Sequence, residues 1–277
     1  MKNGLRHVVI FCLIVATLVL TISCNKPQNE NTTPEESTTL PVVVATPVSE
    51  GLAFAVNEDG KTCTITGIGT CTDTKLYIPD RIEGYSVTCI GHLAFTDNTS
   101  LTFVSIPDSV TRIFSSAFKG CTALIETEDG ISYVDKWVVK CDRFAITASL
   151  REDTVGVAEG SFAFCTELRD VILPDSIKYI NTLAFYNCHA LTGVVLPQHL
   201  EFIADSAFSK CKNLQSIQFS AFVTSIDEHA FEYCSALVEI RFLGTVAQWN
   251  AIEKGTDWDN QTGEYTVHCS DGDVTKQ

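Results

Sequence analysis

A phenylalanine recurs in this chain at a fixed distance, and this recurrence restricts the possible folds more than any other feature. Phe185, Phe208 and Phe231 follow one another at a spacing of 23 residues, and each comes directly after an alanine. A cysteine lies three residues after each phenylalanine, and a leucine lies six residues after it. A unit this short cannot enclose a hydrophobic core, so it must stack on its neighbours. The spacing therefore predicts a solenoid.

The same unit continues towards the N-terminus. Copies centred on Phe162 and Phe118 keep the cysteine and the leucine, whereas the copy at Phe95 has Asn98 at the cysteine position. The chain therefore contains six phenylalanine-centred copies.

The segment after each leucine alternates between apolar and polar residues. In residues 214–219, period-two geometry directs the apolar side chains into the core and Gln218 outward. The Ala-Phe pair is expected to form a short helical or irregular turn. We therefore predict a β-rich solenoid of about 23-residue units whose strands run parallel.

Two segments resemble a known repeat closely. Residues 106–113 read I-P-D-S-V-T-R-I, and residues 173–177 read L-P-D-S-I. With the A-F-x-x-C-x-x-L pattern, these segments resemble the BspA-type leucine-rich-repeat family of bacterial surface lipoproteins, over roughly residues 51 to 270. The resemblance implies a leucine-rich-repeat solenoid capped at both ends. It also implies contact with a host, since members of this family are associated with adhesion to extracellular-matrix proteins.

The repeat pattern sets the expected domain boundaries. We expect an N-terminal β-rich cap over residues 51–90, the solenoid over 91–242, and a C-terminal cap and tail over 243–277. Phe118 and Phe162 are 44 residues apart, which is close to two periods but not equal to them. Alternating residues between them predict a hairpin-like insertion around residues 125–160, with a turn near Asp135.

The N-terminus carries an export signal. Residues 1–23 combine a basic start with a short apolar run, which is typical of a signal peptide. The run ends in L-T-I-S-C, which resembles a bacterial lipoprotein cleavage box and predicts lipidation of Cys24; an ordinary secretory signal is the alternative. Residues 24–50 are rich in Pro, Thr, Asn and Glu, so we expect a flexible, lipid-anchored stalk. The predicted location is the cell envelope, at the outer membrane or the cell surface.

Charge and side-chain chemistry exclude several functions. The chain has 34 acidic and 19 basic residues, a formal net charge of −15, which disfavours nucleic acid as a partner. The six histidines are scattered and form no zinc-like or catalytic spacing. No phosphate-binding glycine motif is present. The sequence therefore predicts no enzyme, no cofactor and no metal, and membrane contact only through the lipid anchor.

The repeats predict a regular outer surface. If equivalent positions of parallel strands line up, two outward ladders form. They are predicted to contain Ile172, Val195, Gln218 and Arg241 in the first, and Arg112, Tyr179, Phe202 and Ser225 in the second. Apolar and aromatic side chains in such ladders can form a contact patch for a ligand. The alternative is that these side chains pack against neighbouring loops.

The cysteines allow more than one interpretation. Cys165, Cys188, Cys211 and Cys234 form a column that is expected to be a buried row of free thiols, with one disulfide or a metal as alternatives. Cys63 and Cys71 bracket two glycines of an expected hairpin. In an exported protein these two cysteines could form a disulfide.

Together these features predict a cell-surface binding protein. Its repeat surface is expected to contact an extracellular protein or a glycan, with a host-matrix adhesin as one form of that function. The alternative is a structural or scaffold lipoprotein of an envelope assembly.

Overall fold

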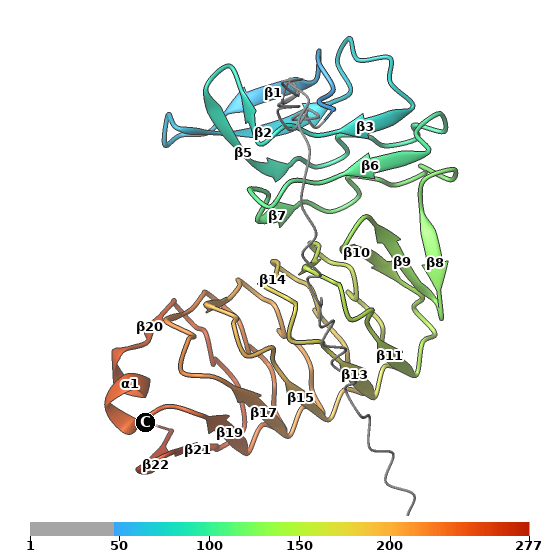
Figure 1. Cartoon of the computed structure of the whole chain (residues 1–277). Helices are drawn as coiled ribbons and strands as arrows, with labels where there is room; N and C mark the ends of the chain where they lie inside the picture. Colours follow the sequence, from blue (N-terminus) through green and yellow to red (C-terminus); the bar gives the residue numbers. More distant parts are fainter. Residues whose placement is uncertain (1–46, 277) are drawn as a thin grey trace, which may run out of the picture. The chain divides into compact units, whose positions relative to one another are not determined.

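The computed structural model describes residues 47–276, which form a β-solenoid of about nine turns with a spacing of about 23 residues (Figure 1). Almost all regular structure in these residues is short β-strand, with one short helix near the C-terminus. The predicted leucine-rich-repeat solenoid is therefore confirmed.

In the coils from residue 168 to residue 242, the first strand follows the repeat leucine, and these strands run parallel to one another. Val194, Ile217, Ile240 and Val267 occupy equivalent positions and point into the core. β11 pairs with β13, and the next four strands pair in sequence order. This row, called here the first sheet row, contains β11 (Thr147–Ser149), β13 (Asp170–Ile172), β15 (Gly193–Val195), β17 (Ser216–Phe219), β19 (Glu239–Phe242) and β21 (Thr266–Cys269).

A second row of two-residue strands lies later in each coil. Ile203 and Ile226 pair across two of these strands and are buried. β12 pairs with β14, whereas β16, β18 and β20 form a separate ladder. The row contains β12 (Gly156–Val157), β14 (Tyr179–Ile180), β16 (Phe202–Ile203), β18 (Ser225–Ile226) and β20 (Glu253–Lys254).

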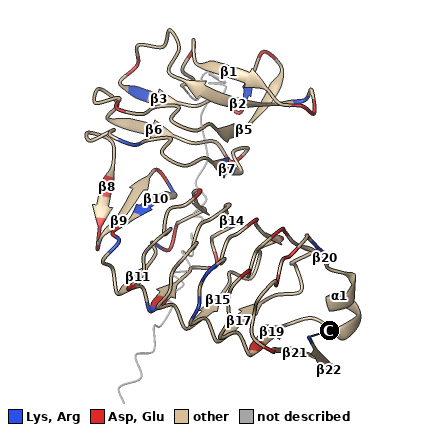
Figure 2. Cartoon of the chain, turned by 180° about the vertical axis from the view of Figure 1, so that it is seen from behind, with Lys and Arg blue, Asp and Glu red and all other residues tan. Residues whose placement is uncertain are grey.

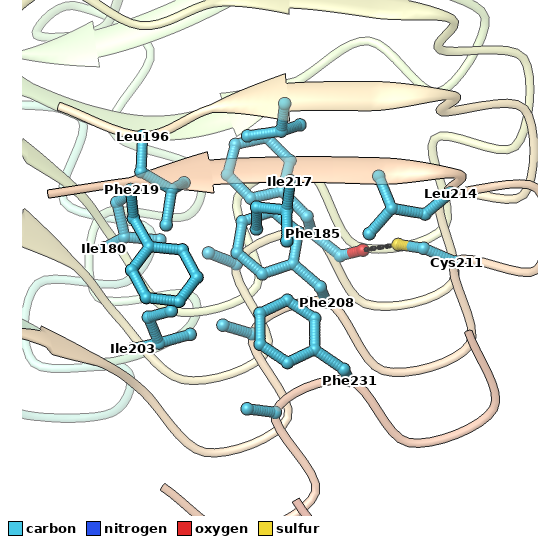
Figure 3. Close-up of a cluster of buried hydrophobic side chains, with 14 of the residues drawn as sticks. Ile180, Phe185, Leu196, Ile203, Phe208, Cys211, Leu214, Ile217, Phe219 and Phe231 are labelled. Carbon is cyan, nitrogen blue, oxygen red and sulfur yellow. Dashed lines mark hydrogen bonds between the residues drawn. The ribbon is translucent and has the colours of Figure 1, made fainter. Parts of the chain in front are cut away.

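The Ala-Phe segments form irregular turns that stack their phenylalanine rings. The rings of Phe185 and Phe208 lie 5.2 Å apart and are nearly parallel, and Phe231 continues the stack (Figure 3). The N–H of Phe185 donates to the carbonyl of Ala207 in the next coil at 2.8 Å. The thiol of Cys211 donates to the carbonyl of Phe185 at 3.2 Å. Stacking and hydrogen bonding thus link successive coils at the same place.

The N-terminal part of the described chain is richer in longer strands. β2 pairs antiparallel with β1 and parallel with β5, and β3 pairs parallel with β6. Ser49 is buried, and its N–H donates to the carbonyl of Tyr77, so the folded part includes a residue that the sequence had placed in the stalk. The strands are β1 (Ala53–Val56), β2 (Thr62–Gly67), β3 (Lys75–Tyr77), β4 (Arg81–Ile82), β5 (Tyr85–Ile90), β6 (Phe103–Ser105) and β7 (Arg112–Ile113).

A three-stranded antiparallel segment interrupts the coils. β8 (Glu126–Glu128) pairs with β9 (Ile131–Val134), and β9 pairs with β10 (Trp137–Cys141). The turn between β9 and β10 contains Asp135 at a φ of 52°, where the sequence had placed a turn. The hydrophobic core of residues 47–276 falls into two clusters, and this segment contributes to both: Ile131, Tyr133, Val138 and Cys141 to one, and Val134 and Trp137 to the other.

Aromatic residues close the C-terminal end. The rings of Trp249, Trp258 and Tyr265 pack edge to face, with Trp249 and Trp258 6.1 Å apart. Trp249 lies in α1 (Val246–Ala251), whose first turn is capped by a reciprocal pair of hydrogen bonds between Thr245 and Gln248. β22 (Gly272–Thr275) pairs antiparallel with β21 and ends the first sheet row.

Candidate functional site

The outward face of the first sheet row carries exposed apolar side chains. Ile172 and Val195 are 64% and 60% exposed, although both lie in β-strands. Val195 is paired with Gln218, and Gln218 with Arg241. β13 is not hydrogen-bonded to β15, but Ile172 and Val195 line the same surface depression. We call Ile172, Val195, Gln218 and Arg241, the residues of the first predicted ladder, the outer column.

Two further residues extend the outer column. Ser149 pairs with Ile172 at one end, and His268 pairs with Arg241 at the other. The sequence analysis missed both. Ser149 lies 23 residues before Ile172, so the period alone identifies it. His268 follows Arg241 by 27 residues because α1 lengthens the last coil, so the period does not identify it.

A depression of about 560 Å³ runs along the outer column and the strand backbones beside it. Asp170 and Asp175 contribute acidic side chains to its lining, and Arg241 contributes a basic one. The guanidinium Nε of Arg241 donates to Glu239 at 2.5 Å, and this bond raises the pKa of Arg241. The surface thus combines two apolar side chains with polar groups of both signs, which suits a macromolecular contact.

The second predicted ladder is not formed as expected. Tyr179 stacks on Trp137, with ring centroids 5.9 Å apart, and Phe202 is half-buried against the core. Phe202 does pair with Ser225, as the period requires.

Arg112 does not join that ladder, because β7 pairs with β5 and β10 and β12 precede β14 in its sheet. Its guanidinium lies over the ring of Phe114 and donates to Thr182. The inserted hairpin separates the two coils, so Arg112 and Tyr179 do not occupy equivalent positions.

The cysteine column consists of free, buried thiols in the structure. Burial raises the pKa of the Cys234 thiol to about 12. Cys63 is buried and Cys71 is half-buried, and both are free thiols in the structure. The disulfide between them stays a prediction.

The predicted signal peptide, the lipidation site Cys24 and most of the stalk lie outside the described residues. Within residues 47–276, no group of three or more His, Cys, Asp and Glu side chains could hold a metal ion. The same residues contain no helix with the length and apolar composition that crossing a membrane requires.

A buried asparagine that the sequence analysis missed joins the two core clusters. The side chain of Asn181 accepts a hydrogen bond from the N–H of Ile113 at 3.0 Å and donates to the carbonyl of Thr111 at 3.1 Å. The equivalent positions one coil before and after are Ala158 and Ala204. An asparagine at a repeat position that otherwise holds alanine could therefore have indicated this site in the sequence.

Comparison with known proteins identifies the repeat. Residues 71–145 and 146–252 match the family described as BspA type leucine rich repeat region, with six copies. No curated protein matches the chain.

Several solved structures resemble the chain. A leucine rich cell surface protein from Faecalibacterium prausnitzii is 27% identical and aligns over 81% of this chain and 56% of its own, with a TM-score of 0.40. This chain thus spans little more than half the length of that protein. The leucine rich repeat protein of T. pallidum is 24% identical over 76% of this chain and 85% of its own (TM-score 0.36). The pneumococcal vaccine antigen PcpA is 14% identical over 68% and 67% (TM-score 0.35).

Proposed function

Since this chain belongs to the BspA-type leucine-rich-repeat family, we propose that it is a cell-surface protein that binds an extracellular protein or glycan through the outer column. The exposure of Ile172 and Val195 on adjacent strands is the observation that carries this proposal. A strand residue of a solenoid normally points either into the core or, if polar, into water. Ile172 and Val195 are apolar, yet both point into water. The proposal assigns no catalytic role to the chain.

Burial of apolar side chains supplies favourable free energy when a partner binds. Covering one isoleucine or valine side chain contributes roughly 1.5–3 kcal/mol. Gln218 and Arg241, next in the column, supply hydrogen-bond donors that can orient a partner over the apolar pair. The strands that carry Ile172 and Val195 belong to the first sheet row, so little conformational entropy is lost when a partner binds.

The proposed location rests on the N-terminal sequence. Residues 1–23 are the proposed export signal, and Cys24 is the proposed site of the lipid anchor at the outer membrane or cell surface. A Cys24→Ala variant is expected to leave the membrane fraction and to lose the mass of the acyl groups. Retention of that mass in the variant would refute the assignment of Cys24.

The binding proposal is tested with the purified protein against extracellular-matrix proteins and host glycans. We expect saturable binding that is reduced at least tenfold in an Ile172→Ser/Val195→Ser variant, because roughly 3–6 kcal/mol of apolar burial is removed from the contact. Both residues are exposed, so the variant should fold normally.

Val56→Ser is the matched control, because Val56 is also an exposed strand valine, in β1. Binding by the control but not by the double variant supports the outer column. Equal binding by both variants would move the site elsewhere on the chain. Failure of the unaltered protein to bind any partner would favour the envelope-scaffold function.

A further inference from the structure

The interruption of the coils leaves a cavity beside the second phenylalanine turn. It has a volume of about 470 Å³ and lies between residues 113–120 on one side and β10 with residues 158–161 on the other. We call it the junction pocket. Its size falls within the range of small-molecule sites, about 300–1,000 Å³. In the regular coils, the next turn stacks directly on the phenylalanine and fills the equivalent space.

The junction pocket exposes backbone donors that are paired in the regular coils. In the turn of Phe185, the N–H groups of Leu183, Phe185 and Asn187 each donate to a carbonyl of the next coil, at 3.1, 2.8 and 2.8 Å. The turns of Phe162, Phe208 and Phe231 repeat this pattern.

The corresponding groups in the turn of Phe118 are the N–H groups of Ser116, Phe118 and Gly120. None of the three has a hydrogen-bond acceptor among residues 47–276, and all three residues line the junction pocket. Ser116 and Gly120 have positive φ angles, of 60° and 78°. The equivalent Leu183 and Asn187 of a regular turn also have positive φ angles, of 58° and 63°, so the three N–H groups are expected to point out of the coil as their paired counterparts do. An unpaired backbone donor of this kind is costly unless water or a ligand satisfies it.

The charge of the pocket is opposite to that of the chain. Lys119, Lys140 and Arg143 line it, against the single acidic side chain of Glu159. None of these four side chains forms an ion pair with another residue of the described chain. Figure 2 shows basic residues, in blue, at β10. Three unpaired cations in one pocket are notable in a chain whose formal net charge is −15.

We propose that the junction pocket binds a sulfate or phosphate monoester. A tetrahedral oxyanion accepts several hydrogen bonds at once, so it can accept from N–H groups of this turn while its charge pairs with the lysines and the arginine. The apolar side chains of Phe114, Ile125 and Val139, which also line the pocket, provide a surface for the esterified group. The pocket is separate from the outer column, so this proposal does not depend on the proposed function.

Isothermal titration of the purified protein at constant ionic strength tests the proposal. The probes are inorganic phosphate, inorganic sulfate, glucose 6-phosphate and glucose 6-sulfate. We expect one site per chain for at least one of the two esters, with affinity reduced roughly tenfold or more in a Lys140→Gln/Arg143→Gln variant, because two charge-assisted bonds are lost. The preferred ester identifies the anion as phosphate or sulfate.

The matched control is Arg169→Gln/Lys178→Gln, which removes the same charges from two exposed residues outside the pocket. Unchanged affinity in the control supports a specific site. The proposal is overturned if neither ester binds saturably, if only the inorganic ions bind, or if the control loses as much affinity as the pocket variant.

Discussion

Successive phenylalanine turns stack on one another in the coils from Phe162 to Phe231, but not between Phe118 and Phe162. In the regular coils, rings stack at 4.8 to 5.7 Å and each turn donates its N–H groups to the next turn. Between Phe118 and Phe162 the stack is broken, and a hairpin and a pocket replace it, while Asn181 of a later coil bonds back across the break to residues 111 and 113. The regular coils thus provide a uniform surface, whereas the interruption provides unpaired donors and charges. An interruption of the regular coils can therefore give a repeat protein a distinct site.

The largest expected effect on stability distinguishes a phenylalanine inside a stack from one at the end of a stack. Phe208 is enclosed between Phe185 and Phe231, so Phe208→Ala should cost about 3–5 kcal/mol of unfolding free energy. Among residues 47–276, Phe118 stacks on Phe95 alone, and it borders the junction pocket, so Phe118→Ala should cost less. Denaturant unfolding of the two variants measures the difference. Equal costs would show that the broken stack has no energetic consequence.

A glycine next to the insertion gives the second comparison. A Cβ on Gly156 would lie 2.4 Å from the ring of Trp137, so Gly156→Ala should destabilise the protein by about 1–3 kcal/mol through overpacking. Gly193 in β15 is the control, because the nearest atoms to a Cβ there are the Ser216 hydroxyl, at 3.2 Å, and the Ser216 carbonyl oxygen, at 3.7 Å. Thermal unfolding should show a lower Tm for the Gly156 variant alone. A similar Tm for both variants would contradict the packing of Trp137 described here.

Asn181 tests how the two core clusters are joined. Asn181→Ala leaves the N–H of Ile113 and the carbonyl of Thr111 without their partner and should cost about 1–3 kcal/mol, although Ala204 occupies the same position one coil later. Hydrogen exchange at Ile113 should become faster in the variant. Ala204→Gly, a change at the equivalent position of a regular coil, should leave that exchange rate unaltered; acceleration by both variants would deny Asn181 a specific role.

The smallest expected effect concerns the thiols of the regular coils. Since burial raises the pKa of Cys234 from 9.0 to about 12, the unfolded thiol ionises at lower pH than the folded one. The stabilising contribution is complete below pH 9 and is lost as the pH rises towards 12. Iodoacetamide at pH 8 to 9 should therefore alkylate the half-buried Cys89 before Cys234. Peptide mapping measures both rates, and rapid alkylation of Cys234 in the folded protein would contradict its burial.

The sequence was sufficient for features that depend on the period. The positions of Phe185 and Phe208 predicted their stacking coils, and the alternation around Gln218 predicted which side chains of β17 face outward. These features follow from local geometry repeated at a constant interval, so no long-range information was needed.

Features that depend on contacts across the interruption could not be predicted. Asn181 bonds residues 68 and 70 positions away, and Arg112 lies beside Thr182 rather than in line with Tyr179. The period is lost between Phe118 and Phe162, so the sequence did not indicate which coil follows which. The junction pocket also lies at this interruption. In addition, its unpaired N–H groups are backbone atoms, so they leave no pattern in the side chains that a sequence could reveal.

One binding experiment with two variants tests most directly whether the chain has two separate sites. The purified protein, Ile172→Ser/Val195→Ser and Lys140→Gln/Arg143→Gln are each titrated with an extracellular binding partner and with the preferred monoester. We expect the first variant to lose the partner and keep the monoester, and the second to lose the monoester and keep the partner. Loss of both ligands in either variant, or of neither in both, would contradict two separate sites on the regular and the interrupted coils.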